Sequence, residues 1–330
     1  MNAIEAQRFD WIPPALLLAI ALGALALIGS PSTWFTLTVA GLAMGLLIFI
    51  MSAGLTLVFG LMDVMNFAHG LFIAIGAYIA ASTVKLFAGA AGADSFLANL
   101  GAVLPAMLAA TLAAGLLGLF FERVIIRPVY GQHLKQILIT TGGMIVAEQL
   151  ILVLWGPDLL PLPRPATLRG AFLLGDMALE KYRLGTVAVG LAVFVAMLLV
   201  LNRTKIGLLI RAGVENKEMV EAMGYRIRRL FVAVFVAGSA LAGLGGALWG
   251  MYQESVTVTI GASMMVLIFI VIIIGGLGSI VGCFIGALLV GLMANYVGYL
   301  APKIALGCNI LLMVLVLLWR PQGLYPVGKQ

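Results

Sequence analysis

Charged side chains are scarce in this sequence of 330 residues. Only 10% of the residues are Asp, Glu, Lys or Arg, whereas an ordinary soluble domain has about 25%. Residues 11–62 and 255–302 contain none of the four. Each of these runs is long enough for two membrane crossings, because a helix needs about 20 apolar residues to cross ~30 Å of hydrocarbon. The lack of charge excludes a water-soluble protein and predicts an integral membrane protein.

Strict alternation of apolar and polar residues is also absent, and this excludes a membrane β-barrel. Charges, prolines and glycine clusters instead divide the chain into continuous apolar segments. The predicted fold class is an all-α integral membrane protein, a polytopic bundle of about ten transmembrane helices in a single domain over residues 1–330. The predicted spans are 11–29, 37–61, 68–87, 97–121, 136–155, 184–201, 230–250, 260–275, 280–300 and 304–319.

Residues that carry catalysis or bind metals are few. The only two cysteines, Cys283 and Cys308, lie in separate apolar segments without a CxxC pattern, and there are only two histidines. The HExxH and GxSxG motifs are absent. The spacing of residues 323–330 imitates a phosphate-binding P-loop, but Gln330 stands where Mg²⁺ needs a Ser or Thr hydroxyl. The chain is therefore predicted not to be an enzyme and to bind no metal or other cofactor.

Lysines and arginines are distributed unequally between the connections of the ten-span arrangement. With both termini in the cytoplasm, six of the nineteen lie on the outer side and the other thirteen on the cytoplasmic side. The positive-inside rule favours this orientation. The net charge of +6 thus follows from topology, and no basic patch on a soluble module indicates nucleic-acid binding.

Two connections are long enough to have structure of their own. The outer one, residues 156–183, contains four prolines, which favours a stiff, extended connection with a short helix near Met177. The cytoplasmic one, residues 202–229, has seven basic and three acidic residues. Its centre, residues 211–224, has an amphipathic helical pattern, and Gly224 is placed to cap that helix at its C-terminus.

Three interpretations of the central helix are open: a membrane-surface helix, a solvated segment, or a docking surface for a cytoplasmic partner. A membrane-surface helix normally carries bulky Trp, Phe or Leu on its apolar side. The apolar side here carries small residues and methionines instead, which favours docking. These residues are Ala212, Met219, Val220, Ala222 and Met223.

Small residues recur in the span predicted at 230–250. They stand at Gly238, Ser239, Ala240, Ala242, Gly243 and 245–247. This spacing predicts close helix packing of the small-xxx-small kind. Lining of a pore is the secondary interpretation.

Several motifs follow one another along the chain. They are Asn-Phe-Ala-His-Gly at the end of residues 54–70, Glu-Arg-Val-Ile-Ile-Arg-Pro from residue 122, the glycine-rich run 238–246, Gly-Gly-Leu-Gly-Ser from residue 275 and Arg-Pro-Gln-Gly-Leu from residue 320. In this order they resemble the permease family of branched-chain amino acid transporters. Residues 203–212 and 221–224 resemble the coupling loop of ATP-binding-cassette importer permeases.

The resemblance implies a permease subunit of an ATP-driven importer in the bacterial inner membrane, which carries branched-chain or related amino acids and forms half of the translocation path. The implied partners are a second, similar permease, two cytoplasmic ATPase subunits that bind ATP and magnesium, and a periplasmic substrate-binding protein. A short, capped helix transmits the push of the ATPases, since it is rigid where a loop would yield. The residues expected to contact the ATPases are Arg211, Glu215, Asn216, Met219, Glu221, Ala222, Met223 and Gly224.

Polar groups between the second and third spans are candidates for the translocation path. An ionisable side chain in hydrocarbon costs ~2.5–3.5 kcal/mol, so each one needs a partner or a cavity. Asn66, Phe67 and His69 lie in this connection after Asp63. One interpretation is a wet turn at the cytoplasmic headgroups, in which Asp63 and His69 are exposed. The other is a broken or re-entrant element that is buried in protein and lines the path.

Glu148 and Gln149 lie about two-thirds of the way through the fifth span, and Glu148 is expected to point into the bundle. One interpretation gives Glu148 a hydrogen bond to a polar group of another span, with Ser239 and Asn295 as candidates. The other places it on the substrate path.

Other functions compete with amino acid import. Related permeases resemble this chain and carry urea, short amides or aromatic acids. An ion-coupled secondary transporter would use an intramembrane group such as Glu148 for coupling. A channel is a further alternative. The cytoplasmic connection 202–229 favours the ATP-driven importer, because neither a secondary transporter nor a channel needs it.

Overall fold

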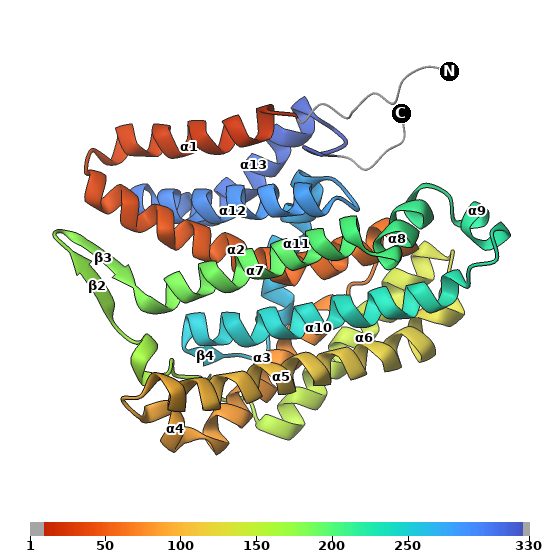
Figure 1. Ribbon diagram of the computed structural model, residues 1–330, viewed down its shortest axis with the longest axis horizontal. Coiled ribbons are helices and arrows are strands. Elements are labelled where there is room, and N and C mark those ends of the chain that lie inside the picture. Colours follow the sequence, from red (N-terminus) through yellow and green to blue (C-terminus); the bar gives the residue numbers. More distant parts are fainter. Residues whose placement is uncertain (1–9, 326–330) are drawn as a thin grey trace.

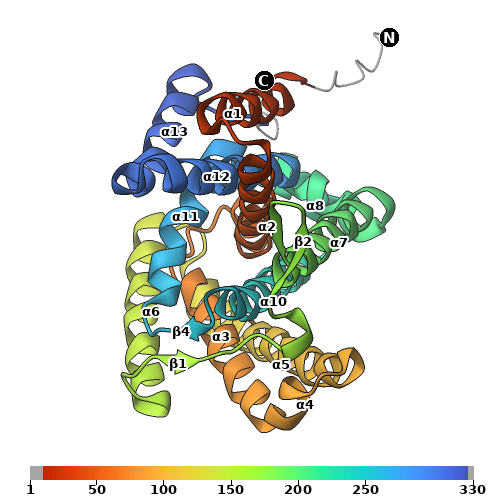
Figure 2. The same ribbon diagram turned by 90° about the vertical axis from the view of Figure 1, so that its left-hand side faces the viewer.

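The computed structural model describes residues 10–325 as a bundle of long helices that lie side by side (Figure 1, Figure 2). A helix is present at each predicted span. The helices are α1 (Ile12–Ile28), α2 (Pro31–Met62), α3 (His69–Leu86), α5 (Phe96–Phe121), α6 (His133–Trp155), α7 (Lys181–Arg203), α10 (Ile227–Gln253), α11 (Ile260–Gly275), α12 (Ile280–Leu300) and α13 (Ala305–Trp319). The short helices α4 (Ala88–Gly92), α8 (Lys205–Glu215) and α9 (Lys217–Ala222) lie in the connections.

Seven helices of the described part are long and apolar enough to cross a membrane. They are α2, α3, α5 with the turns that follow it, α6, α7, α10 and α12. The apolar helices α1, α11 and α13 are shorter, with 17, 16 and 15 residues. The prediction of an all-α, polytopic membrane protein is confirmed.

Two small pairs of β-strands, which the sequence does not predict, involve the connection 156–183. Strand β1 (Leu160–Pro161) pairs with β4 (Ser255–Val256), and β2 (Ala171–Leu174) forms an antiparallel hairpin with β3 (Met177–Glu180). The predicted short helix near Met177 is therefore wrong. Gly175, with a positive φ of 61°, opens a two-residue turn of the kind that joins hairpin strands.

The centre of the bundle is formed by α2, α3 and α10, with α11 and α12 beside them (Figure 2). Large aromatic side chains fill this centre, including Phe49 on α2 and Phe72 on α3. The Phe72 ring meets the rings of Phe121 and Phe235 edge to face, at centroid distances of 5.7 and 6.0 Å. Helices α5, α6 and α7 lie at the edge of the bundle and expose large apolar side chains, as helices in contact with lipid do.

Helix α10 approaches α2 and α3 to within backbone contact. A Cβ atom on Gly54 would overlap the backbone of Gly238, and one on Gly76 would overlap the backbone of Gly243. The predicted close packing of the small residues in α10 is confirmed, because only glycine lets two helices meet in this way. These contacts set the positions of α2 and α3 against one common helix.

Gly246 makes the tightest of these approaches, because its Cβ would overlap the carbonyl oxygen of Ile73 on α3. Replacing Gly246 by Leu is expected to destabilise the protein by about 3 kcal/mol or more, since the obstacle is backbone and cannot move aside. Thermal unfolding in detergent measures the effect. Gly101→Leu on α5, where a Cβ has no neighbour within 4 Å, is the matched control and should unfold like the wild type. Equal unfolding temperatures for all three proteins would contradict this account of α10 packing.

Candidate functional site

The connection between α2 and α3 turns back into the bundle. Helix α2 ends at Asp63, which has a left-handed φ of 54°, and α3 begins at His69. His69 Nε2 lies 2.8 Å from the carbonyl oxygen of Met51 and donates its proton to it. Met51 precedes the end of α2 at Met62 by 11 residues, which is about 16 Å along a helix. The connection therefore re-enters the protein from the end of α2.

Burial divides the predicted residues of this connection into two sets. Asn66 and His69 are each 1% exposed, which agrees with the buried, re-entrant interpretation. Asp63 has an exposed side chain, as the wet-turn interpretation requires, and lies 3.6 Å from His133 at the start of α6. Asn66 satisfies the irregular backbone, because its Oδ1 accepts a hydrogen bond from the N–H of Ala68 at 3.1 Å.

Thr140 of α6 also holds the connection, a role that the sequence does not predict. The N–H of Phe67 donates to Thr140 Oγ1 at 3.2 Å, and the Phe67 ring packs against Phe269 of α11 at a centroid distance of 5.0 Å. Thr140 is fully buried and lies on the same side of α6 as the buried Gln136, one turn earlier. The sequence does carry a signal for this role, because Gln136 and Thr140 are polar residues four positions apart in an apolar span. The contacts join the connection after α2 to the helices α6 and α11 at one point.

Glu148 and Gln149 lie further along α6, away from this cluster. Helix α6 is at the edge of the bundle, Glu148 is partly exposed and Gln149 is exposed. The predicted hydrogen bonds of Glu148 are wrong. Ser239 Oγ donates to the Phe235 carbonyl at 2.9 Å, and Asn295 Nδ2 donates to the Gly291 carbonyl at 2.9 Å. The structure thus brings Asn66, Phe67 and His69 together and places Glu148 and Gln149 on a separate, outward surface.

The candidate coupling segment consists of two helices, α8 and α9, and the prediction of one helix over residues 211–224 is wrong. The chain is extended at Asn216, with a φ of −153°, and Asn216 Oδ1 accepts the N–H of Met219 at 2.9 Å. Asn216 thereby caps the start of α9 and ends α8. The side chain of Glu215 lies outside the described residues.

Gly224 ends α9 as predicted. Its φ is 87°, its N–H donates to the Glu221 carbonyl at 2.9 Å, and the N–H of Tyr225 donates to the Val220 carbonyl at 3.3 Å. These two bonds form a Schellman motif, in which a left-handed glycine closes the helix. The end of α9 is therefore a defined structure and not a frayed turn.

The apolar residues of α9 do not share one side. Val220 is 2% exposed and faces the protein, whereas Met219 and Met223 are 59% and 65% exposed. Glu221 and Ala222 are also exposed, and so is Arg211 on α8, which donates to Asn202 Oδ1 at 3.3 Å. Seven of the eight predicted coupling residues are thus exposed, while Val220 fixes the segment to the bundle. These seven are Arg211, Asn216, Met219, Glu221, Ala222, Met223 and Gly224.

A pocket of about 190 Å³ lies between α9 and the connection after α2. Glu221 lines it from α9, Asp63 from the connection and His133 from the start of α6. Ile227 and Arg228 of α10 complete the wall on one side. The two regions that the sequence singles out therefore meet at this pocket.

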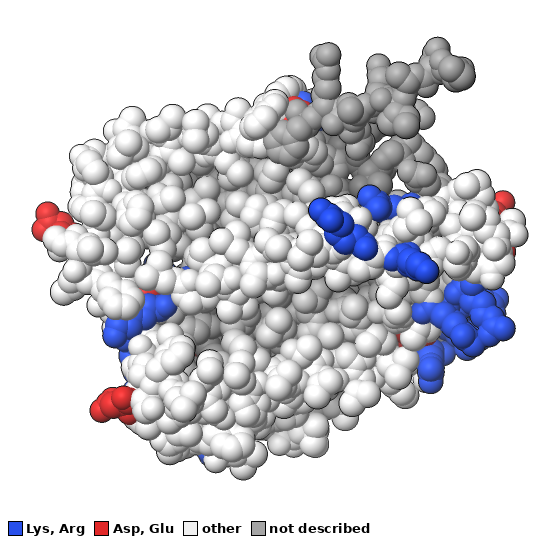
Figure 3. Space-filling model, in the orientation of Figure 1, with Lys and Arg blue, Asp and Glu red and all other residues white. Residues whose placement is uncertain are grey.

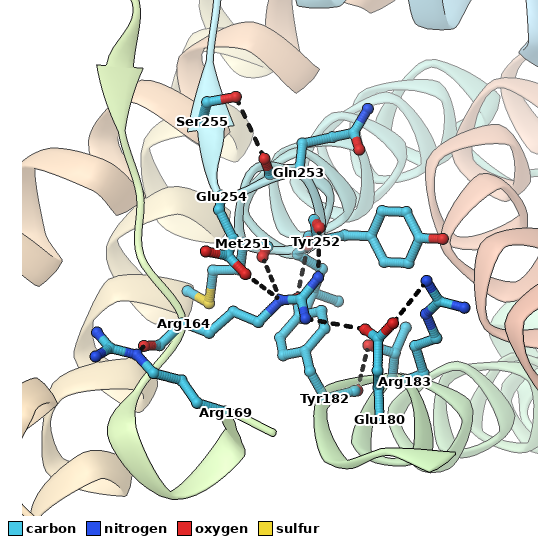
Figure 4. A network of polar contacts seen from close by, with 12 residues as sticks. Arg164, Arg169, Glu180, Tyr182, Arg183, Met251, Tyr252, Gln253, Glu254 and Ser255 are labelled. Atoms are coloured by element: carbon cyan, nitrogen blue, oxygen red, sulfur yellow. Dashed lines mark hydrogen bonds and ion pairs between the residues drawn. The ribbon is translucent and has the colours of Figure 1, made fainter. Parts of the chain in front are cut away.

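At the opposite end of the helices, Arg164 organises a network that the sequence does not predict (Figure 4). Its guanidinium group donates to the carbonyl oxygens of Met251 and Tyr252 at 3.2 and 2.8 Å, at the C-terminus of α10. It also pairs with Glu180 at 3.0 Å and Glu254 at 3.2 Å. The network fastens the connection 156–183 to the last turn of α10.

Arg183 and Tyr182, the neighbours of Glu180 on α7, belong to the same network. Arg183 pairs with Glu180 at 2.8 Å, and the Arg164 guanidinium stacks 5.1 Å from the centre of the Tyr182 ring. Tyr182 donates its hydroxyl proton to the Leu248 carbonyl at 2.6 Å. The start of α7 and the end of α10 are thus held together through Arg164, whose side chain is 15% exposed.

Comparisons with known proteins agree on one family. The family described as "Branched-chain amino acid transport system / permease component" matches residues 37–318. The high-affinity branched-chain amino acid transport system permease protein BraD of Pseudomonas aeruginosa is 30% identical over 87% of this chain and 94% of its own length. The corresponding protein LivH of Escherichia coli K12 is 28% identical over 86% of this chain and 92% of its own. The probable branched-chain amino acid transport permease protein LivM of Methanocaldococcus jannaschii is 26% identical, over 85% and 90%. No solved structure matches the chain.

The Arg164 network is open to a direct test by Arg164→Gln. The Arg164 side chain is 15% exposed and its partners Glu180 and Glu254 are 33% and 55% exposed, so removing the guanidinium group costs about 2 kcal/mol. Detached states of the connection 156–183 then become roughly thirtyfold more populated. Limited digestion with chymotrypsin should therefore cut this connection much faster than in the wild type. Lys303→Gln removes an equally positive but exposed side chain and serves as the control. Unchanged cleavage of the Arg164 variant would mean that the β-strand pairs alone hold the connection.

Proposed function

Because the chain belongs to the permease family of branched-chain amino acid transport systems, we propose that it is the transmembrane subunit of an ATP-driven importer for branched-chain or related amino acids. The family consists of transport permease components and is not a family of enzymes. In this proposal the chain forms half of the translocation path in the bacterial inner membrane. None of the relatives described above has a name that favours urea, short amides, aromatic acids or ion-coupled transport.

The proposed topology has ten spans with both termini in the cytoplasm. Arg320, after α13, pairs with Asp10, before α1, and this ion pair requires an even number of crossings between them. The hydrogen bond from Arg320 lowers the pKa of Asp10, so the pair is charged at neutral pH. Lys and Arg also gather at the end of the molecule that carries α8 and α9 (Figure 3), as the positive-inside rule expects of the cytoplasmic end. Arg8 and Lys329, two of the thirteen basic residues predicted to lie on the cytoplasmic side, lie outside the described residues.

The proposed assembly contains a second, similar permease, two ATPase subunits with ATP and magnesium, and a periplasmic protein that delivers the substrate. The whole chain, residues 1–330, is one permease domain. Relatives named LivH and LivM both match it, which supports a pair of similar permeases. The ATPases would bind the exposed surface of the cytoplasmic connection 202–229, and the delivering protein would face the connection 156–183.

The observation that carries this proposal is the pocket shared by Glu221, Asp63 and His133. A displacement of α9 by the ATPases would reach the connection after α2 through α8, which packs on the end of α2 beside this pocket, where Gly213 meets the Leu61 side chain. That connection is bound to α6 through Phe67 and Thr140, so α6 moves with it. Elements that are this tightly packed move as rigid bodies, which suits a gate at the far end of α6.

The proposed path runs along the outward surface of α6. A carboxylate that faced lipid from the middle of a span would cost ~2.5–3.5 kcal/mol, so Glu148 is expected to face water, substrate or the second permease. Gln149 lies beside it on α6. The connection that contains Asn66, Phe67 and His69 contacts the same helix at Thr140, nearer its cytoplasmic end. A path between the two permeases would be lined by Glu148 and Gln149, while Asn66 and His69, each 1% exposed, would support α6 from within the bundle.

Changing the end of α9 should uncouple ATP hydrolysis from uptake. In the double variant Ala222→Leu, Gly224→Val, the exposed surface becomes bulky and the left-handed Gly224 is strained by about 1–2 kcal/mol. We expect uptake in reconstituted vesicles to fall at least about tenfold while ATPase activity persists, because a shift of 1.4 kcal/mol in docking suffices for that factor. Gly29→Leu, at a φ of 71° with no neighbour within 4 Å, carries the same strain far from α9 and should transport normally. Normal uptake by the double variant would remove α9 from the coupling mechanism.

Glu148→Gln tests the path separately from coupling. The amide keeps the shape but removes a charge, and charged hydrogen bonds are about twice as strong as neutral ones. Apparent affinity for amino acids in uptake assays is expected to change by roughly tenfold, with ATPase coupling preserved. Asp94→Asn, at an exposed position before α5 and outside the connection 156–183, removes the same charge away from the path. A substrate profile identical to that of the wild type would mean that Glu148 has only a packing role.

A further inference from the structure

Four arginines line a cavity at the cytoplasmic end of α5 and α10. Arg123 and Arg127 lie in the helical turns that follow α5, and Arg228 and Arg229 lie in the first turn of α10. The cavity has a volume of about 370 Å³, and Val232 forms part of its apolar wall. All four arginines are exposed. We name them the arginine pocket.

The charge of the arginine pocket is not balanced within the described residues. None of its four arginines forms an ion pair with a residue of the range 10–325. The pocket has one carboxylate, Glu122, which is 1% exposed. Four cations and one anion leave a charge of +3 around a single cavity. Such an excess attracts a multivalent anion.

Tyr130 engages only half of the Glu122 carboxylate. Its hydroxyl donates to Glu122 Oε1 at 2.5 Å, and burial together with this bond raises the pKa of Tyr130, so it remains a donor. Glu122 Oε2 is buried and has no hydrogen-bond partner. This oxygen is free to accept a hydrogen bond inside the pocket. The donor would be a guanidinium group that a ligand draws inward, or a hydroxyl group of the ligand itself.

An apolar ridge on α5 leads to the arginine pocket. Its residues recur every four positions and all are exposed: Leu104, Leu108, Leu112, Leu116, Phe120 and Val124. The 21 residues from Leu104 to Val124 extend about 30 Å along the helix, the thickness of the hydrocarbon core. Arg123 and Arg127 follow at the end of this ridge, at the level of the lipid headgroups.

We propose that the arginine pocket binds the phosphate group of an anionic phospholipid whose acyl chains lie along the α5 ridge. Guanidinium groups bind phosphate oxygens in pairs, and four of them converge on one cavity. Basic pockets between membrane helices are typical sites for anionic headgroups. The ridge distinguishes a lipid from a free phosphate ion, since only a lipid uses both features. The proposal needs only this chain and does not depend on its transport cycle.

Lipid titration of the full-length chain in an uncharged detergent, followed by native mass spectrometry, tests the proposal. Phosphatidylglycerol should bind the wild type and phosphatidylcholine should not. In the double variant Arg127→Gln, Arg228→Gln, affinity for phosphatidylglycerol should fall about 25-fold, at roughly fivefold for each arginine. The variant Arg127→Lys, Arg228→Lys keeps the charges and should retain most of the binding. Arg203→Gln, Lys205→Gln removes two charges from the same end outside the pocket and should bind like the wild type.

Three results would overturn the proposal. Equal binding of phosphatidylcholine would show that the ridge alone retains lipid. Displacement of bound phosphatidylglycerol by millimolar inorganic phosphate would make the pocket a site for a free anion. If the Gln double variant bound phosphatidylglycerol normally but released ATPase subunits from the assembled transporter, the arginines would be a protein contact. A melting curve for each variant, taken without lipid, separates loss of binding from loss of fold.

Discussion

Backbone contact between α10 and its neighbours is the constraint on which the rest of the structure depends. Because Gly238 and Gly243 carry no side chain, α2 and α3 both lie directly against α10, and their mutual position is set by it. Helix α3 must then begin deep in the bundle, beside Met51, although α2 continues to Met62. To reach the start of α3, the connection after α2 must run back into the protein. The buried polar groups of that connection follow from close helix packing and not from a separate binding loop.

Helix α10 also joins the two ends of the molecule. Its first turn lines both the pocket beneath α9 and the arginine pocket, and its last carbonyl groups are bound by Arg164. A helix held by glycine contacts along its length and fixed at both ends transmits displacement with little loss. The same helix is therefore suited to carry a displacement from α8 and α9 to the connection 156–183, parallel to the route through Thr140 and α6.

Sequence reasoning located the helices well, because charged residues and prolines are rare inside membrane helices and gather where spans end; Pro105 in α5 and Glu148 in α6 are exceptions. It also placed the cap at Gly224, whose conformation is encoded locally. It was wrong where the same residue fits two local structures. Asn216 lies inside the single helix predicted over residues 211–224, yet its side chain caps the start of a second helix. It failed again at Glu148, because an apolar span has no period that shows which side packs, and only its neighbours decide that. Arg164 and Thr140 act through contacts distant in sequence, which no local pattern contains.

The ion pair between Asp10 and Arg320 joins the first and last described parts of the chain, and Tyr325 adds a hydrogen bond to the Asp10 carbonyl at 2.5 Å. Contacts across more than 300 residues form only after the last helix has been inserted. The contact between Asp10 and Arg320 can therefore form only late in synthesis, and α1 has no such partner before then. The two limits of the described part of the chain, Asp10 and Tyr325, therefore lie close to each other. A short linker between them, with new ends opened in an exposed connection, would leave the order of helices around α10 unchanged.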